Sequence, residues 1–173
     1  GVAIDPGLGQ ALVTARSATV MDAFALSSTP GTITSFPVQS QPTAIAVDPV
    51  RHLAAVANTQ SNSVSLVDLT QATATEHIAT SGLPSGVAFD PVSGSFLVSA
   101  SLNNRLLILD PISRSTSAFR VGINPTSTAY NFASSTLVTI NSSSQTMTVV
   151  DFQALRVRAV LNVKASGRFA VDI

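Results

Sequence analysis

The sequence predicts an all-β fold, a β-propeller of about four four-stranded antiparallel blades followed by the first strand of a fifth. Short apolar runs of similar sequence recur along the chain, and each ends in an acidic or amide residue: Asp5, Asp48, Asp90, Asn131 and Asp172. Successive copies are 43, 42, 41 and 41 residues apart. Repeats of about 40–45 residues that each hold several short strands are typical of propeller blades.

The second repeat shows how one blade is built. Its apolar, β-branched runs predict strands at residues 43–47, 53–57, 64–68 and 73–80, with polar turn residues between them. Pro84 then starts the same pattern again. The predicted blades comprise residues 1–41, 42–83, 84–124 and 125–165, and residues 166–173 form the first strand of a further blade. We expect the chain to be part of a larger propeller, and a closed ring of four blades is the alternative.

One alanine stands at the same place in every expected first strand: Ala3, Ala46, Ala88, Ala129 and Ala170. First strands crowd together near the axis of a propeller, so a small side chain is expected there. The residues that follow the alanines are large and apolar, and we expect them to pack between adjacent blades: Ile4, Val47, Phe89, Tyr130 and Val171.

The composition excludes several classes of function. Charged residues make up 10% of the chain and balance to a net charge of zero, so the sequence favours neither nucleic-acid binding nor electrostatic membrane binding. No apolar run approaches the roughly 18 residues of a membrane span. The chain has no cysteine, which excludes disulfides and thiolate metal sites. Many uncharged polar residues and little lysine favour an exported bacterial protein, located extracellularly, in the periplasm or at the cell surface.

The second repeat resembles a known family. The segment PTAIAVDP at residues 42–49, followed by AVAN at 55–58 and SVSLVD at 63–68, resembles the YVTN repeat family. The family's tetrapeptide falls on residues 55–58, and in the fourth repeat it falls near residues 137–141. The resemblance covers essentially the whole chain and implies a β-propeller of bacterial and archaeal surface-layer or secreted proteins. NHL-like propellers share much of this pattern.

The repeated acidic residues are interpreted as structural. In an Asp-Pro turn, the aspartate accepts backbone hydrogen bonds and the proline presets φ. The two histidines, His52 and His77, belong to a second and an outer fourth strand, so we expect them to share neither a metal site nor a catalytic triad. The sequence therefore predicts no catalytic residue, no metal and no cofactor.

The candidate binding residues lie in the loops between second and third strands. These loops and the links between blades are expected on one face, where amides, hydroxyls and arginines could bind a peptide or a glycan by hydrogen bonds. The predicted site residues are Asn58, Asn62, Asn103, Arg105, Asn141 and Gln145. The alternative is that Asn and Ser stand there only because they are good turn residues.

The sequence thus favours a non-catalytic interaction or scaffold module of an exported or cell-surface bacterial protein, with a protein or glycan partner. The alternative is a fragment of a propeller enzyme such as a lactonase. By resemblance, lactonases of related folds place carboxylates and amides on the central channel, whereas the inner strands here supply Ala, Val, Ile, Phe and Tyr. We further expect self-association, or association with the remainder of a parent chain, to complete the ring.

Overall fold

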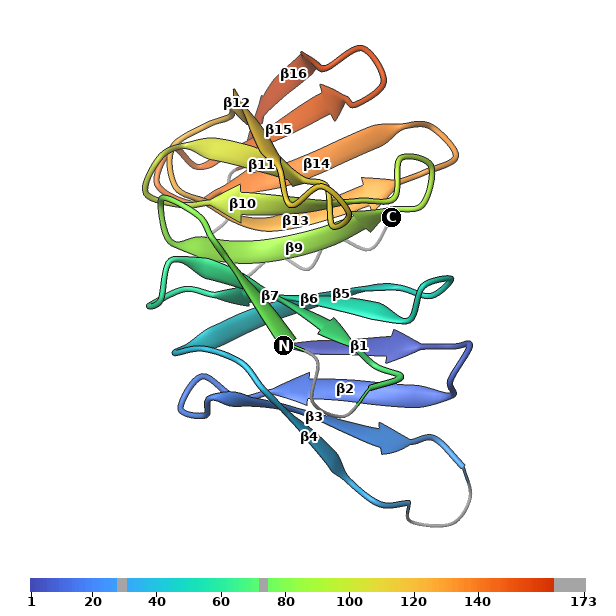
Figure 1. The fold of residues 1–173 in the computed structure, drawn as a ribbon. Helices are drawn as coiled ribbons and strands as arrows, with labels where there is room; N and C mark the ends of the chain where they lie inside the picture. The colour runs from blue at the N-terminus through green and yellow to red at the C-terminus, as the bar shows by residue number, and fades with distance from the viewer. Residues whose placement is uncertain (28–30, 72–74, 164–173) are drawn as a thin grey trace. The chain divides into compact units, whose positions relative to one another are not determined.

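The computed structural model describes residues 1–27, 31–71 and 75–163. It contains four four-stranded sheets, and the strands of each sheet follow one another in chain order (Figure 1). Every strand pair is antiparallel, for example β6 with β7 and β14 with β15. The predicted all-β fold of four-stranded antiparallel blades is confirmed. The expected first strand of a further blade, residues 166–173, lies outside the described residues.

The chain divides into two compact units, Gly1–Pro84 (unit 1) and Ser85–Ile173 (unit 2), each with two sheets. The strands of unit 1 are β1 (Val2–Asp5), β2 (Gln10–Thr14), β3 (Val20–Ala25), β4 (Thr34–Pro37), β5 (Pro42–Asp48), β6 (Leu53–Asn58), β7 (Ser63–Asp68) and β8 (Thr75–Ala79). Those of unit 2 are β9 (Pro84–Asp90), β10 (Ser95–Ala100), β11 (Arg105–Leu109), β12 (Thr116–Arg120), β13 (Pro125–Asn131), β14 (Thr136–Asn141), β15 (Thr146–Asp151) and β16 (Arg156–Asn162).

The turn between the first and second strands is built by the repeated acidic residue. Asp5 Oδ1 accepts hydrogen bonds from the backbone N–H groups of Gly7 and Leu8 at 2.8 and 3.1 Å. In the next repeat, Asp48 Oδ1 accepts from two backbone N–H groups at 3.0 and 3.1 Å. The third and fourth repeats form the same turn with Asp90 and Asn131. The structural role predicted for these residues is confirmed.

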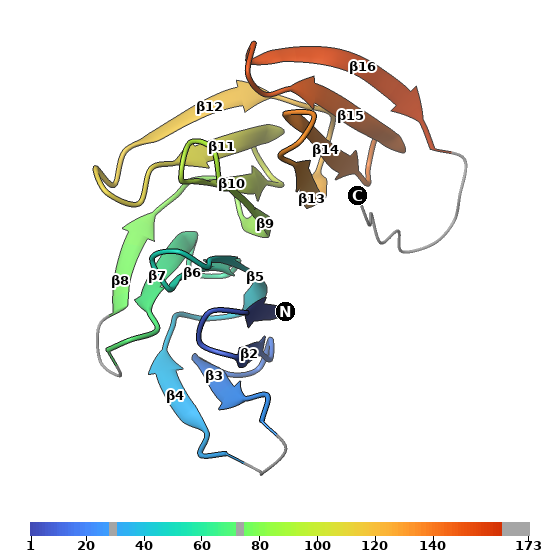
Figure 2. The ribbon, with the colours of Figure 1, turned by 90° about the vertical axis from the view of Figure 1, so that its right-hand side faces the viewer.

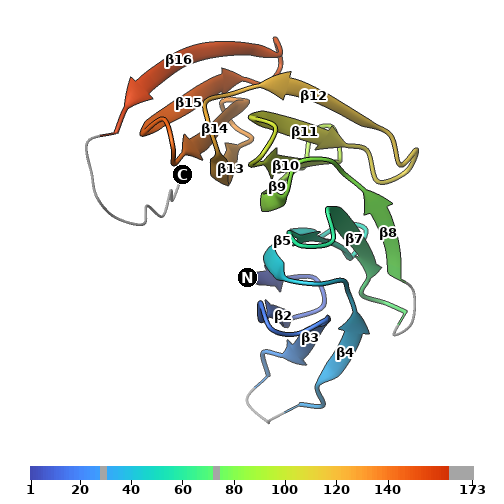
Figure 3. The same ribbon diagram turned by 90° about the vertical axis from the view of Figure 1, so that its left-hand side faces the viewer.

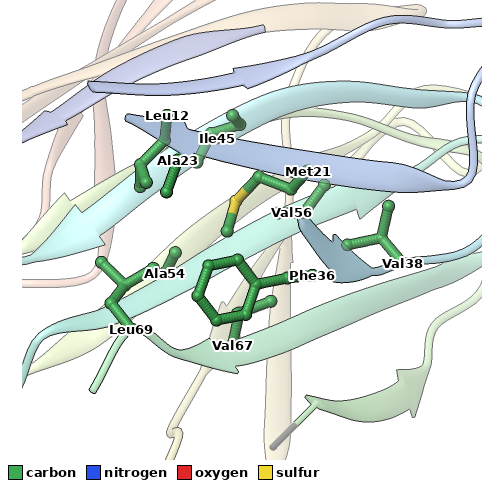
Figure 4. Close-up of a cluster of buried hydrophobic side chains, with 10 residues drawn as sticks. All are labelled: Leu12, Met21, Ala23, Phe36, Val38, Ile45, Ala54, Val56, Val67 and Leu69. Carbon is green, nitrogen blue, oxygen red and sulfur yellow. The ribbon is translucent and has the colours of Figure 1, made fainter. Parts of the chain in front are cut away.

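The core of unit 1 lies between its two sheets (Figure 4). Met21 and Phe36 of the first sheet meet Val56 and Val67 of the second, and all four side chains are essentially inaccessible to solvent. Burial of one such side chain contributes about 1.5–3 kcal/mol. The period-two alternation of the strands therefore directs one face of each sheet into a shared apolar layer.

The core of unit 2 repeats this arrangement with different residues. Leu97 and Leu106 of one sheet pack with Leu137 and Val150 of the other. At the margin of this core, the rings of Tyr130 and Phe152 meet edge to face with centroids 5.5 Å apart.

The first strands of the two sheets of unit 1 approach one another. In unit 1, β1 lies beside β5, whereas β4 and β8 form the far sides of their sheets (Figures 2 and 3). Ala3 of β1 packs against the core, as does Val47 of β5. Ile4 differs from the expected packing between blades, because 56% of it is exposed on the face of the first sheet that points away from the core. Ala170 and Val171 lie outside the described residues.

Candidate functional site

Antiparallel connectivity gives each sheet two chemically different ends. The loop between second and third strands and the link to the following sheet leave from one end, here called the loop end. The turns that contain the repeated acidic residues leave from the opposite end, the turn end. In unit 2 the loop end comprises residues 101–104, 121–124 and 142–145.

The structure places Asn58 inside unit 1. The residue ends β6 and has no exposed surface. Its Nδ2 donates hydrogen bonds to the hydroxyl groups of Ser63 and Ser65 at 3.1 and 2.8 Å, and its Oδ1 accepts one from the backbone N–H of Gln39 at 3.3 Å. The amide joins the second strand, the third strand and the link that enters the sheet. Asn58 therefore holds the loop end together from within, and a ligand on the surface would not contact it.

Asn141 occupies the matching position at the end of β14 and is also fully buried. Its Nδ2 donates to Thr146 Oγ1 and Thr148 Oγ1 at 3.2 and 2.8 Å, while its Oδ1 has no hydrogen-bond partner among the described residues. A Cβ at Gly122 would lie 2.5 Å from this amide, so only glycine fits the link that crosses it. For Asn58 and Asn141 the structure thus replaces the predicted surface role with a structural one.

Asn62 fixes the link to the next sheet and is itself exposed. Its Oδ1 accepts from the backbone N–H of Leu83 at 2.9 Å, and its carbonyl accepts from Thr80 N at 2.7 Å. In unit 2 the same two bonds are made by Asn104, to Asn124 N and Val121 N. Asn104 was not among the predicted site residues, although its position directly before a third strand matches that of Asn62.

The remaining predicted residues lie together at the loop end of unit 2. Asn103, Arg105 and Gln145 are all exposed there. Gln145 has a φ of 52° and its carbonyl accepts from the backbone N–H of Val163 at 2.9 Å. Of the six predicted residues, these three and Asn62 can meet a partner at the surface.

Hydrogen bonds tie the three segments of this loop end into one platform. The link at residues 121–124 lies between the other two loops. On one side, Asn124 N–H donates to Asn104 Oδ1 at 2.9 Å. On the other, Ile123 N–H donates to Ser144 Oγ at 3.1 Å and Asn124 Nδ2 donates to Ser143 Oγ at 3.2 Å. The loop end of unit 2 is therefore braced against rearrangement.

Two large apolar side chains project from this platform. Leu102 is 70% exposed and Ile123 is 55% exposed. They stand in adjacent segments, because the link that carries Ile123 is bonded to the loop that carries Leu102. The surface thus combines apolar groups with amides, hydroxyls and arginines, a mixture typical of recognition surfaces.

The zero net charge conceals an uneven distribution along the sequence. Residues 85–173 carry seven of the nine lysines and arginines but only four of the nine acidic residues. Residues 1–84 carry the other two basic residues and the other five acidic residues. At the loop end of unit 2, Arg120 stands opposite Arg105 in the pairing of β11 with β12. Sequence analysis named Arg105 and missed Arg120. The sequence does hold a signal for Arg120, because in an antiparallel meander the first residue of the third strand pairs with the last residue of the fourth strand.

The titratable groups of the turn end serve the fold. His52 Nδ1 lies 2.8 Å from the buried Asp5 Oδ2, which joins the two sheets of unit 1, and Arg51 Nη1 donates to Asp48 Oδ2 at 2.7 Å. His77, in the middle of β8, instead has its Nδ1 2.9 Å from Ser65 Oγ. The two histidines thus have separate partners. Among the described residues, no group of three or more His, Asp or Glu side chains could hold a metal ion.

Two side chains near the turn end have shifted pKa values. Burial, together with the negative charge of Asp90, raises the pKa of the Tyr130 hydroxyl above 10.0. The pKa of Asp68 is lowered, chiefly because its carboxylate accepts a hydrogen bond from the Thr70 hydroxyl at 2.6 Å. Both groups lie at turn-end positions, so neither contributes to the loop end.

The described part of the chain contains no helix long and apolar enough to cross a membrane.

No protein-family model and no curated protein sequence matches the chain. Three similar solved structures all belong to β-propeller proteins. Hydrazine synthase of Kuenenia stuttgartiensis has a TM-score of 0.83 at 21% identity, over 92% of this chain and 47% of that chain. The fold is that of a β-propeller.

The other two similar structures extend the comparison. Catalytically inactive virginiamycin B lyase from Staphylococcus aureus, solved with quinupristin, has a TM-score of 0.78 at 10% identity, over 96% of this chain and 56% of that chain. A chain of the nidogen/laminin complex has a TM-score of 0.78 at 16% identity, over 94% of this chain and 62% of that chain. The chain spans about half to three fifths of the length of these neighbours.

Proposed function

We propose that this chain is a non-catalytic β-propeller interaction module, of YVTN type, from an exported or cell-surface bacterial protein. Its loop end binds a protein or a glycan. The observation that carries the proposal is the platform of unit 2, where three loops are joined by side-chain and backbone hydrogen bonds beneath exposed polar and apolar groups. Recognition residues are commonly found on loops that a rigid scaffold positions.

Pre-organisation is the physical reason that this surface suits binding. A loop that is already ordered loses little conformational entropy when a partner docks, so more of the contact energy becomes affinity. Leu102 and Ile123 offer apolar area, while Asn103, Arg105 and Gln145 offer hydrogen bonds. One of the similar structures comes from a complex of two proteins, which supports a protein as the partner.

The non-catalytic part of the proposal rests on what the loop end offers chemically. Its described side chains are amides, hydroxyls, arginines and alkyl groups, which bind well but are weak general acids and bases near neutral pH. Export is supported by the composition, in which uncharged polar residues rather than charges keep the surface hydrated.

The test uses the full chain as an immobilised target. A random peptide library displayed on phage and a glycan array are each screened for binding, and the binders are then measured against two matched variants. Leu102→Ala removes an exposed alkyl group at the loop end, and Ile112→Ala removes one at the turn end of the same sheet, where 65% of the residue is exposed. Neither substitution opens a core cavity, so both variants should fold.

We expect binders whose affinity falls several-fold with Leu102→Ala and is unchanged with Ile112→Ala. The opposite order would move the binding surface to the turn end. Absence of any peptide or glycan binder that depends on the loop end would overturn the proposed function.

A further inference from the structure

Two arginines stand side by side at the loop end of unit 2. Arg105 is the first residue of β11 and Arg120 the last residue of β12, and their Cα atoms are register partners in the sheet. Partners in an antiparallel pair project from the same face, with Cβ atoms about 5 Å apart. Both residues are exposed. Two guanidinium groups are thus held at neighbouring positions by the backbone of the sheet.

No acidic group of the described unit 2 neutralises this pair. The acids of residues 85–163 are Asp90, Asp110 and Asp151, and all three lie at the turn end. Asp110 follows the same strand that Arg105 begins, so about 16 Å of extended backbone separates them. Within the described residues, neither arginine side chain has a hydrogen bond or an ion pair, whereas the side chain of Arg156 pairs with Asp151. The sheet therefore carries a charge polarity, positive at the loop end.

Such an arrangement is unfavourable in the isolated chain. Like charges directly opposite one another on adjacent strands destabilise the pair. A bound anion would remove the repulsion and gain two charge-assisted hydrogen-bond donors at once. Guanidinium groups present planar forks that match a carboxylate in two parallel hydrogen bonds.

The surroundings of the pair indicate what carries the anion. Leu102 and Ile123 are exposed on the loops beside it. In addition, β12 is the last strand of its sheet, so one of its edges has no strand partner among the described residues. An extended peptide can add to such an edge through main-chain hydrogen bonds while its side chains reach the neighbouring groups. A chain with both acidic and apolar side chains fits all three features.

We propose that Arg105 and Arg120 bind a carboxylate of an acidic, extended peptide segment in a protein partner. This inference rests on the proposed function, since it assigns the chemistry of the partner to the same loop end. A peptide fits better than a nucleic acid or a sulfated glycan, because polyanions are held by neutralising many charges. This loop end has two arginines set among apolar and uncharged polar groups.

The experiment measures binding of two labelled peptides to the full chain by fluorescence anisotropy at low salt. In the first probe, glutamate alternates with valine and threonine, and in the second every glutamate is replaced by glutamine. A sulfated oligosaccharide and a single-stranded oligonucleotide serve as polyanion probes. The variants are Arg105→Gln, Arg120→Gln and the control Arg158→Gln, which removes an exposed arginine of β16.

We expect the glutamate peptide to bind, the glutamine peptide to bind about tenfold more weakly, and either loop-end variant to lose a similar factor, as for loss of one charge-assisted contact. Arg158→Gln should bind as the parent does. Equal binding of the two peptides, no binding of the glutamate peptide, or an equal effect of the control variant would each refute the inference. Tighter binding of a polyanion through the same two arginines would refute it in favour of that ligand class.

Failure of this inference can be told apart from failure of the proposed function. If library peptides bind in a manner that depends on Leu102 but not on Arg105 or Arg120, the loop end binds partners and the carboxylate assignment is wrong. If no binder depends on Leu102, the function itself is wrong.

Discussion

Replacing Asn58 by alanine is expected to destabilise the chain strongly, even though the residue borders a surface loop. Its amide makes three hydrogen bonds in the interior, two through Nδ2 and one through Oδ1. The two serine hydroxyls keep other partners, because Ser63 donates to Gln39 Oε1 and Ser65 contacts His77. The partly buried backbone N–H of Gln39 loses its acceptor, Asn58 Oδ1.

The magnitude follows from these bonds. Each net hydrogen bond contributes about 1 kcal/mol, and the lost amide also leaves a small void in a close-packed region. We therefore expect a loss of about 2–4 kcal/mol in the free energy of unfolding. Since a chain of 150–250 residues shifts by about 2–4 °C per kcal/mol, the melting temperature should fall by roughly 5–15 °C.

The assay is urea and thermal unfolding followed by circular dichroism, with Gln60→Ala as the matched control. Gln60 is exposed in the same loop, so its replacement should change stability by less than about 0.5 kcal/mol. A double-mutant cycle with Ser65→Ala should give a coupling above about 0.5 kcal/mol, because the two side chains are 2.8 Å apart. A stability of Asn58→Ala within error of Gln60→Ala, or zero coupling, would refute the reasoning.

Three further outcomes are expected. Asn141→Ala should lower the free energy of unfolding less than Asn58→Ala does, because the Oδ1 of Asn141 has no hydrogen-bond partner among the described residues. Urea unfolding of the two variants measures the difference. The raised pKa of Tyr130 means that the tyrosine ionises at lower pH in the unfolded chain than in the folded chain, so the stability should fall as the pH rises above 10. In a series of melting temperatures measured against pH, Tyr130→Phe should reduce this fall. The full chain should self-associate through the apolar outer face of its first sheet, and Phe24→Ser should shift light scattering towards the monomer.

The fold could be predicted from the sequence because its signals are local and repeated. Period-two runs mark the strands, and the Asp turn needs only the residues that follow it, so Asp5 and Asp48 could be assigned from one repeat. Alanine in the first strands of unit 1 reflects the close approach of β1 and β5. The exposure of Ile4 could not be predicted in this way, because it depends on whether another sheet covers the face of the first sheet on which Ile4 lies.

The candidate site was predicted less completely, because it depends on depth and on pairing across strands. Asn58 and Asn62 are both asparagines near one loop. Asn58 is the last residue of β6 and is buried, whereas Asn62 comes directly before β7 and is exposed. Residue type does not separate them, whereas counting strand positions would. Arg120 lies 15 residues beyond Arg105, and only the register of β11 and β12 brings the two together.

At the loop ends, the buried amides stabilise the fold, whereas the exposed arginines are available to bind a partner. Asn58 and Asn141 occupy the same place in the second and fourth repeats, while the third repeat has the buried Ala100 there. In that repeat the hydroxyl of Ser101 donates to the Pro125 carbonyl at 2.8 Å, as the hydroxyl of Thr59 donates to the Pro84 carbonyl at 2.7 Å in the second repeat. A hydroxyl group at the start of the loop thus holds the link that leaves the sheet in both repeats. Because the path is fixed from beneath, the outward positions at Leu102, Arg105 and Arg120 are free to vary with the partner, and specificity is expected to reside in them.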